Sequence, residues 1–143
     1  MNTSVAATYE RPLPAITEDN EPFWLSAQEH ALKLQQCGNC SRFRYFVSPI
    51  CPNCGSFDFA WERISGLGTV YTFTVVERAP SVSWASEVPY VYAIVQVDEG
   101  PLLPTNIVGC DPAEVRIGMP VTITYDDVTE QITIPKFRPA DES

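Results

Sequence analysis

The chain has 143 residues, which is enough for one domain of ordinary size or for a compact module with a smaller appendage, and too few for two large domains. Hydrophobic residues make up 45% of it and charged residues 19%, a balance that can form a core and that excludes a disordered chain. Acidic residues outnumber basic ones 18 to 9, and the net charge of -9 disfavours non-specific binding to nucleic acids and to anionic membranes.

The N-terminal region, residues 1–19, is rich in Pro, Ala, Thr and acidic residues without a sustained period, so we expect an extended arm. It lacks a charged segment followed by an apolar stretch, and we expect no secretory signal. The chain contains no run of about 18 apolar residues, so we expect no membrane span. We therefore expect a soluble cytoplasmic protein, in which thiols stay reduced and paired cysteines indicate metal binding before disulfides.

Residues 20–36 are predicted to form a single amphipathic helix, with Pro22 near its start and acidic residues at the favourable end of its dipole. The apolar residues that recur at helical spacing are Phe23, Ala27, Ala31 and Leu34. Trp24 is expected to be a packing anchor rather than a ligand-binding residue. His30 has no metal-binding partner at a matching spacing, so we place it on the helix surface.

Four cysteines form the most specific motif in the chain. They follow the spacing C-x2-C-x10-C-x2-C and are Cys37, Cys40, Cys51 and Cys54. Two CxxC turns joined by a hairpin supply the four soft ligands of a tetrahedral zinc ion. We predict one structural zinc; a rubredoxin-type iron centre and a redox dithiol are the alternatives. Gly38 and Gly55 are expected to provide the unusual dihedral angles of the two turns.

The segment around the cysteines is locally basic. Residues 31–57 contain Lys33, Arg42 and Arg44 and no carboxylate, whereas the rest of the chain carries a net charge of -12, since -9 minus +3 is -12. Four thiolates on Zn²⁺ carry a formal charge of about -2, which these side chains partly offset.

The second half of the chain is predicted to be β-structure. Residues 68–78 and 90–98 are mostly β-branched or aromatic and form two long strands, and residues 102–108, 121–125 and 131–135 form shorter ones. Five such strands are typical of an OB-fold barrel, and a mixed α+β sheet is the alternative. Gly66 and Gly68 would let the first strand coil sharply. In the connection 109–120, Asp111 is expected to cap a helical turn and Ile117 to fill the barrel bottom.

No catalytic constellation is apparent. A catalytic cysteine needs a base, and the only histidine lies about 80 residues before Cys110, so we expect Cys110 to be a small buried residue. The carboxylate pairs at 98–99 and 126–127 fall in predicted turns. Phosphate-loop, serine-hydrolase and zinc-protease motifs are lacking. The different-class alternative is a stand-alone single-stranded nucleic-acid-binding protein, with bases stacked on tyrosine and phenylalanine side chains of the barrel strands at 71, 73, 90 and 92.

Taken together, these segments resemble a family of acyl-CoA-associated proteins, long catalogued as a domain of unknown function, in which a helix and a rubredoxin-like zinc ribbon precede an OB-fold. The matching segments are PFW at 22–24, CGNC, CPNCG, WERISGLGTVYTFTVV at 61–76, PYVYAIVQVDEGP at 89–101, TNIVGCDPAEVRIGMPV at 105–121 and PKFRPA at 135–140. We therefore expect an extended arm at 1–19, a helix plus zinc ribbon at 20–60, an OB-fold at 61–138 and a tail at 139–143.

The resemblance implies a non-catalytic accessory subunit of a thiolase-like acyl-CoA enzyme, either an acetyltransferase or a steroid side-chain retro-aldolase, with a hot-dog-fold hydratase as another partner. The catalytic residues of such complexes belong to the partner. Lys33, Arg42 and Arg44 become candidates for contact with CoA phosphates or with an acidic patch of the partner. Candidates for docking are Phe23 and Trp24, together with Val82 and Trp84 in the proline-bounded loop 78–89.

Overall fold

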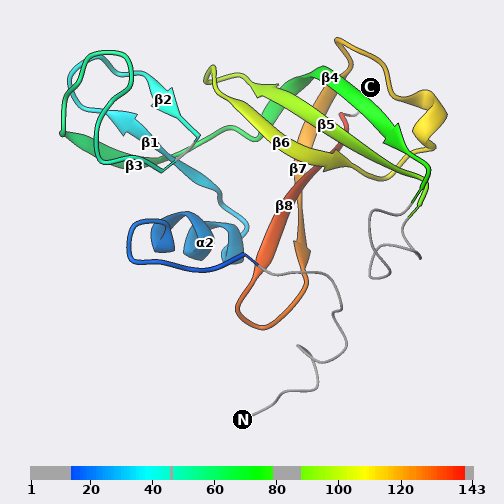
Figure 1. Ribbon diagram of the computed structural model, residues 1–143, viewed down its shortest axis with the longest axis horizontal. Helices are drawn as coiled ribbons and strands as arrows, with labels where there is room; N and C mark the ends of the chain where they lie inside the picture. Colours follow the sequence, from blue (N-terminus) through cyan, green and yellow to red (C-terminus); the bar gives the residue numbers. More distant parts are fainter. Residues whose placement is uncertain (1–13, 46, 79–87, 141–143) are drawn as a thin grey trace.

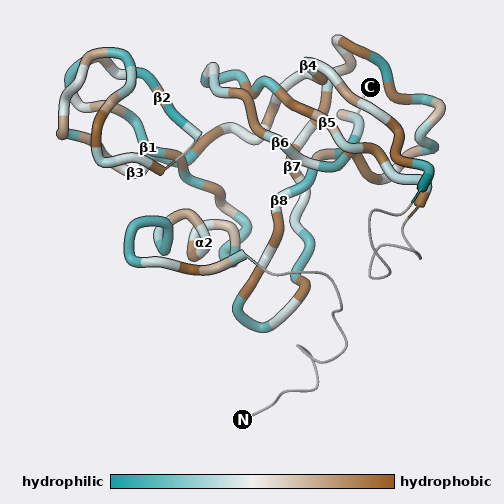
Figure 2. The backbone as a smooth tube through the Cα atoms, in the orientation of Figure 1, coloured by the Kyte–Doolittle hydropathy of each residue, from teal (hydrophilic) through white to brown (hydrophobic). Residues whose placement is uncertain are grey.

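The computed structural model describes residues 14–45, 47–78 and 88–140, so most of the expected N-terminal arm lies outside the described residues. The described chain is mainly β and has two parts that lie side by side: a short helix with a three-stranded sheet, and a closed five-stranded barrel (Figure 1). Hydrophobic residues follow the barrel strands, and hydrophilic ones gather at several of the connecting turns (Figure 2).

The helix is shorter than the sequence predicts. Helix α2 spans only Glu21–Gln28, and His30 with a φ of 59° stops the helical path. The following residues form strand β1, Lys33–Cys37, whose Leu34 is fully buried. The prediction of one helix over 20–36 is therefore wrong, because β1 lies between two other strands and their backbone hydrogen bonds outweigh the helical spacing of Ala31 and Leu34.

The three-stranded sheet has the order β2-β1-β3, with both pairs antiparallel. Strand β2 spans Phe43–Arg44 and β3 spans Phe59–Arg63. Strand β1 leads directly into the first cysteine, since Cys37 is its last residue and pairs with Phe59. The sheet thus holds the start of the first CxxC turn against β3.

The barrel has the strand order β4-β5-β6-β8-β7, which confirms the predicted OB-fold and excludes the mixed α+β sheet. Its strands are β4 (Leu67–Val76), β5 (Tyr90–Val97), β6 (Leu102–Ile107), β7 (Pro120–Asp127) and β8 (Thr133–Pro139). All pairs are antiparallel except β6 and β8, which are parallel and share one pair, Ile107 with Phe137. Strands β7 and β8 are longer than predicted because they pair along seven positions as a hairpin.

Strand β4 serves two neighbours, as the two glycines near its start predict. Gly68 pairs with Val97 of β5 on one side and with Val121 of β7 on the other. A Cβ atom at Gly68 would lie 2.6 Å from the backbone oxygen of Gln96, and Gly66 has a φ of +84°. A side chain at Gly68 would displace the backbone of β5, and one at Gly66 would be strained by the left-handed backbone and would meet the side chain of Ile123.

The barrel core contains Phe137, which is completely buried, and the inward side of β5. The turn before β7 differs from the expectation in one respect. Asp111 caps the 3₁₀ turn η2, Pro112–Glu114, by accepting a hydrogen bond of 2.9 Å from the N–H of Ala113. Ile117, however, is 67% exposed, so its predicted place at the barrel bottom is wrong; Val115 and Met119 are buried on either side of it instead.

The two parts are joined by direct contacts as well as by the chain. The Tyr125 hydroxyl on β7 accepts a hydrogen bond of 3.0 Å from the N–H of Leu32, and the ring of His30 stacks on Tyr125 with centroids 4.7 Å apart. Gln28 donates to the carbonyl of Glu130 at 2.7 Å in the β7–β8 turn. These contacts fasten the end of the helix to the β7–β8 hairpin.

Candidate metal centre

Each CxxC motif forms a tight turn with the same backbone pattern. In the first, the N–H of Ser41 bonds to the carbonyl of Cys37 at 3.0 Å; in the second, the N–H of Gly55 bonds to the carbonyl of Cys51 at 2.9 Å. The first cysteine of each turn also donates its own N–H, to Arg42 and to Ser56 respectively. The two turns are therefore repeats of one local structure.

Both turns need a left-handed residue immediately after the second cysteine. Gly55 has a φ of +80° and Ser41 a φ of 66°. The expectation for Gly55 is confirmed, but the first turn places its left-handed residue at Ser41 and not at Gly38. At Gly38 an added Cβ atom would lie 2.6 Å from a carboxylate oxygen of Asp58, so a larger residue there would displace this exposed side chain.

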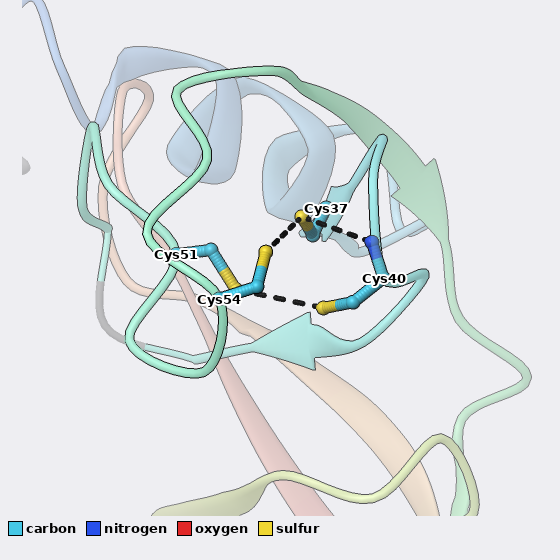
Figure 3. Close-up of side chains that lie close together, drawn as sticks. All are labelled: Cys37, Cys40, Cys51 and Cys54. Carbon is cyan, nitrogen blue, oxygen red and sulfur yellow. Dashed lines mark hydrogen bonds between the residues drawn. The ribbon is translucent and has the colours of Figure 1, made fainter.

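The two turns bring the four cysteine sulfurs together (Figure 3), with all four ligand atoms within 4.8 Å of one another. The Sγ atoms of Cys37 and Cys54 are 3.6 Å apart, as are those of Cys40 and Cys51. Zinc–sulfur bonds of about 2.3 Å in a tetrahedron require sulfurs about 3.8 Å apart. The cluster therefore fits one zinc ion, and all four thiols are free rather than joined as disulfides.

Backbone N–H groups stabilise the thiolate form of the first cysteine in each turn. Cys37 Sγ accepts from the N–H groups of Asn39 and Cys40 at 3.3 and 3.4 Å. The N–H of Cys40 is the main cause that lowers the pKa of Cys37 to about 6, and the N–H of Cys54 does the same in direction for the pKa of Cys51. Metal binding requires thiolates, so these turns prepare the ligands electronically.

The basic residues near the cluster have different environments. Arg44 is only 7% exposed; its Nε donates to Gln35 Oε1 at 3.1 Å, its Nη2 to the carbonyl of Ser48 at 2.7 Å, and its guanidinium lies 5.0 Å from the ring centroid of Phe59. These contacts give Arg44 a structural role and leave little of its side chain exposed to a ligand or a partner. Its guanidinium instead links β2 to the loop before Cys51.

Arg42 is exposed and lines a shallow pocket of about 290 Å³ on the ribbon, together with Pro52 and Asn53 of the second turn. Lys33 is half-buried on β1 and is not among the residues that line this pocket. Arg44 lines the same pocket but is buried, so Arg42 is the basic residue that solvent reaches most readily beside the second cysteine turn.

Two docking candidates lie on α2. Phe23 is 8% exposed and belongs to the core, so it offers almost no surface to a partner. Trp24 is half-buried, makes an edge-to-face contact with Phe23 at 4.9 Å and lines a small cavity of about 100 Å³ with Tyr45 and Pro104. Val82 and Trp84 lie outside the described residues.

Three carboxylates of the predicted turns have structural partners, and the pair at 126–127 lies at the end of strand β7 and not in the predicted turn. Glu99 accepts from the N–H of Ser65 at 2.8 Å, and Asp126 pairs with Lys136 at 2.9 Å. Asp127 accepts from Thr133 and lies 3.0 Å from His30 Nε2. The 97-residue separation of His30 and Asp127 left no sequence signal for this pair.

Cys110 was expected to be buried; it packs against the barrel core but is only half-buried. Burial is the main cause that raises the pKa of its thiol, and the nearby carboxylates of Glu114 and Asp111 raise it further. A raised pKa makes a thiol a poor nucleophile.

Among the described residues, no helix is long and apolar enough to cross a membrane.

Family models match both parts of the chain. Residues 24–60 match the model described as the rubredoxin-like zinc ribbon domain of ChsH2, and residues 61–126 match the C-terminal OB-fold domain of ChsH2. The first model contains all four clustered cysteines, so the centre is that of one structural zinc. Four thiolates fill a tetrahedral zinc and leave no open position for substrate.

Several known proteins are similar to this chain. A solved structure described as the Ltp2-ChsH2(DUF35) aldolase has a chain that is 40% identical, with a TM-score of 0.81 over 90% of this chain and 100% of that one. A "DUF35 domain-containing scaffold protein" of Methanocaldococcus jannaschii is 36% identical over 66% of this chain and 67% of its own length.

Two longer relatives are named as hydratase subunits. A "Probable enoyl-CoA hydratase alpha subunit" of Thermomonospora curvata is 40% identical over 91% of this chain. A "3-oxo-4,17-pregnadiene-20-carboxyl-CoA hydratase alpha subunit" of Mycobacterium tuberculosis is 37% identical over 80% of this chain. The aligned segments make up only 40% and 36% of these relatives, so the chain corresponds to about two fifths of each.

Proposed function

The chain belongs to the DUF35 family, in the ChsH2-type form with a zinc ribbon followed by an OB-fold, and from this membership we propose that it is a non-catalytic accessory subunit of an acyl-CoA enzyme. The partner that we propose is a thiolase-like enzyme, an acetyltransferase or a steroid side-chain retro-aldolase, which this chain binds and stabilises. The observation that carries the proposal is the 40% identity to a chain of the Ltp2-ChsH2(DUF35) aldolase, in a match that covers 90% of this chain and all of that one.

The names of other relatives support a role within an assembly. Three archaeal relatives that are 35–37% identical are called scaffold proteins, and two bacterial ones are called subunits of hydratases that act on CoA esters. A hydratase is therefore the alternative partner. The chemistry of the zinc centre agrees with a supporting role, because its four-thiolate coordination serves folding and not catalysis.

We place the docking surface at Trp24 and at the loop that contains Val82 and Trp84. Large aromatic side chains contribute disproportionately to protein interfaces, and truncating one central residue often costs 2 kcal/mol or more, which is roughly a thirty-fold loss of affinity. Trp84→Ala is expected to weaken the complex while leaving its zinc content unchanged. A complex that elutes unchanged from a sizing column would refute this placement.

We further propose that Arg42 meets an anionic group of the acyl-CoA path, such as a CoA phosphate, or an acidic patch of the partner, with Lys33 as a second, less exposed contact. Arg42→Ser in the assembled complex is expected to raise the partner's KM for its CoA ester and to leave kcat unchanged. An unchanged KM removes the phosphate contact from the proposal. Arg44 is unsuitable for this test, because its substitution would disturb the ribbon itself.

The decisive experiment is co-expression with a candidate enzyme. Ltp2 is one candidate, and the hydratase partner class is the other. We expect the soluble yield and activity of the true partner to fall when this chain is omitted or when Cys54→Ser disrupts the zinc centre. A partner that is equally soluble and active without this chain would refute the accessory role. A salt-dependent gel shift with single-stranded DNA would favour the nucleic-acid-binding alternative.

A further inference from the structure

The outer half of β4 pairs with only one neighbour. Strand β4 pairs with β7 over Leu67–Thr69. Val70 donates a backbone hydrogen bond to Met119 and accepts one from Gly118, both in the loop before β7. A bulge between Val70 and Thr72 then turns the strand, and residues 72–76 pair with β5 alone (Figure 1). Among the described residues, nothing hydrogen-bonds to the other side of this segment.

The alternation of the ladder shows which backbone groups face outward. The N–H of Asp98 bonds to the carbonyl of Leu67 on β4. Counting back from Asp98, every second residue of β5, which includes Ile94 and Tyr92, therefore turns its backbone N–H and C=O groups toward β4. The positions between them face β6, and their partners on β4 therefore turn their N–H and C=O groups away from β5. These partners are Phe73 and Val75, opposite Ala93 and Val91.

The side chains at this edge are incompletely covered. Phe73 and Val75 point to the core side and contact the core, yet both remain partly exposed, whereas their partners Ala93 and Val91 are buried. Thr72 and Thr74 are exposed on the opposite face. A further strand beside β4 would cover the first pair and would find β-branched neighbours on the second face.

Other open edges of the chain carry features that discourage pairing. Strand β3 ends in the exposed charges Glu62 and Arg63, β7 ends in Asp126 and Asp127, and β6 contains Pro104. Residues 71–76 (YTFTVV) contain no charge, proline or glycine. Proteins protect exposed edges with charge, proline or a bulge unless another chain covers them. The bulge of β4 precedes residues 72–76, which pair with β5 in unbroken register, so this edge has the character of a binding site.

We propose that residues 72–76 of β4 receive an extended segment of the enzyme partner as an added strand, an inference that rests on the proposed function. Backbone hydrogen bonds to Phe73 and Val75 would hold the segment, as in other cases of β-strand addition. The occupant belongs to the partner and not to a second copy, because each copy carries a net charge of -9 and two would repel. The segment is expected to have lysine or arginine flanking its paired residues.

The test uses the full zinc-loaded chain and the co-expressed enzyme, with Ltp2 as the first probe. Val75→Pro removes an outward N–H without removing a ladder bond to β5, and Val75→Thr keeps that N–H in a side chain of similar shape. We expect Val75→Pro to weaken the complex at least about ten-fold and Val75→Thr to bind like the wild type. Should Val75→Pro fail to fold, amide exchange on the wild type replaces it, with the Phe73 and Val75 amides slowing at least about ten-fold on assembly.

The outcomes separate the two proposals. If the wild type binds the enzyme and Val75→Pro binds equally well, or the two amides stay unprotected, the strand addition is overturned and the accessory role stands. If the wild type binds neither candidate enzyme, both are overturned. If the isolated chain is a dimer that Val75→Pro converts to a monomer, the edge pairs with a second copy and the assignment to the enzyme is overturned.

Discussion

Replacing Arg44 by alanine tests whether this side chain stabilises the ribbon or serves a ligand. The substitution removes two hydrogen bonds from a charged donor, to Gln35 and Ser48, each contributing about 1.5–3 kcal/mol, and a cation–π contact with Phe59 of about 0.5–2 kcal/mol. It also removes the cost of Nη1, which is buried without a hydrogen-bond partner, of about 1–3 kcal/mol. We therefore expect Arg44→Ala to destabilise the protein by about 3 kcal/mol.

The assay is urea unfolding of the zinc-loaded protein, followed by zinc release to a chromogenic chelator. With a denaturant dependence of about 1–3 kcal/mol per molar, 3 kcal/mol lowers the unfolding midpoint by about 1–3 M. The exposed Arg42→Ala is the matched control and should shift the midpoint little, because solvent-exposed charges contribute little to stability. An unchanged midpoint for Arg44→Ala, with a raised KM of the assembled enzyme, would refute the structural assignment and restore the ligand contact.

Three further predictions follow from the ribbon and from its contact with the barrel. Ser41→Gly should raise the stability of the ribbon by roughly 1 kcal/mol and Gly55→Ala should lower it by a similar amount, because both positions have a left-handed backbone. Thermal unfolding measures both changes, and stability changes of the same sign would contradict the shared structure of the two cysteine turns. Thr133 and then His30 lower the pKa of Asp127, so its stabilising contribution is complete above the ordinary carboxyl value of about 3.9 and is lost as the pH falls through the lower folded value. Asp127→Asn should therefore make the free energy of unfolding depend less steeply on pH in the acidic range, and an unchanged pH dependence would contradict this. Chelation of zinc should abolish the dispersed NMR signals of the ribbon and leave those of the barrel, whereas retention of the ribbon signals would show that the metal is dispensable for folding.

The cysteine cluster and the barrel could be predicted because their signals are local. The spacing of Cys37, Cys40, Cys51 and Cys54 determines two chelating turns, and runs of β-branched residues are typical of strands wherever they pair. The helix was overextended because Ala31 and Leu34 satisfy helical spacing as well as the burial pattern of a strand. Only the pairing of β1 with two other strands decides between these alternatives, and that pairing is a tertiary contact.

The environments of single residues were less predictable. Arg44 and Arg42 are two positions apart and have the same chemistry, and in one continuous strand they would lie on the same face. Arg42, however, precedes β2, so Arg44 is buried against Gln35 while Arg42 is exposed. Ile117 was expected inside because it is apolar, but the turn buries Val115 and Met119 and leaves no inward position between them. Burial of an isolated side chain depends on the path of the backbone, which composition does not describe.

The fastening of the helix end to the β7–β8 hairpin has a consequence for partner choice. The stacking of His30 on Tyr125 and the hydrogen bonds from Leu32 and Gln28 hold the ribbon at a set distance from the barrel. The ribbon and the barrel therefore present their surfaces at a fixed spacing. An enzyme that contacts both parts loses no entropy in ordering a hinge between them, whereas an enzyme whose contact sites have a different spacing can bind only one part.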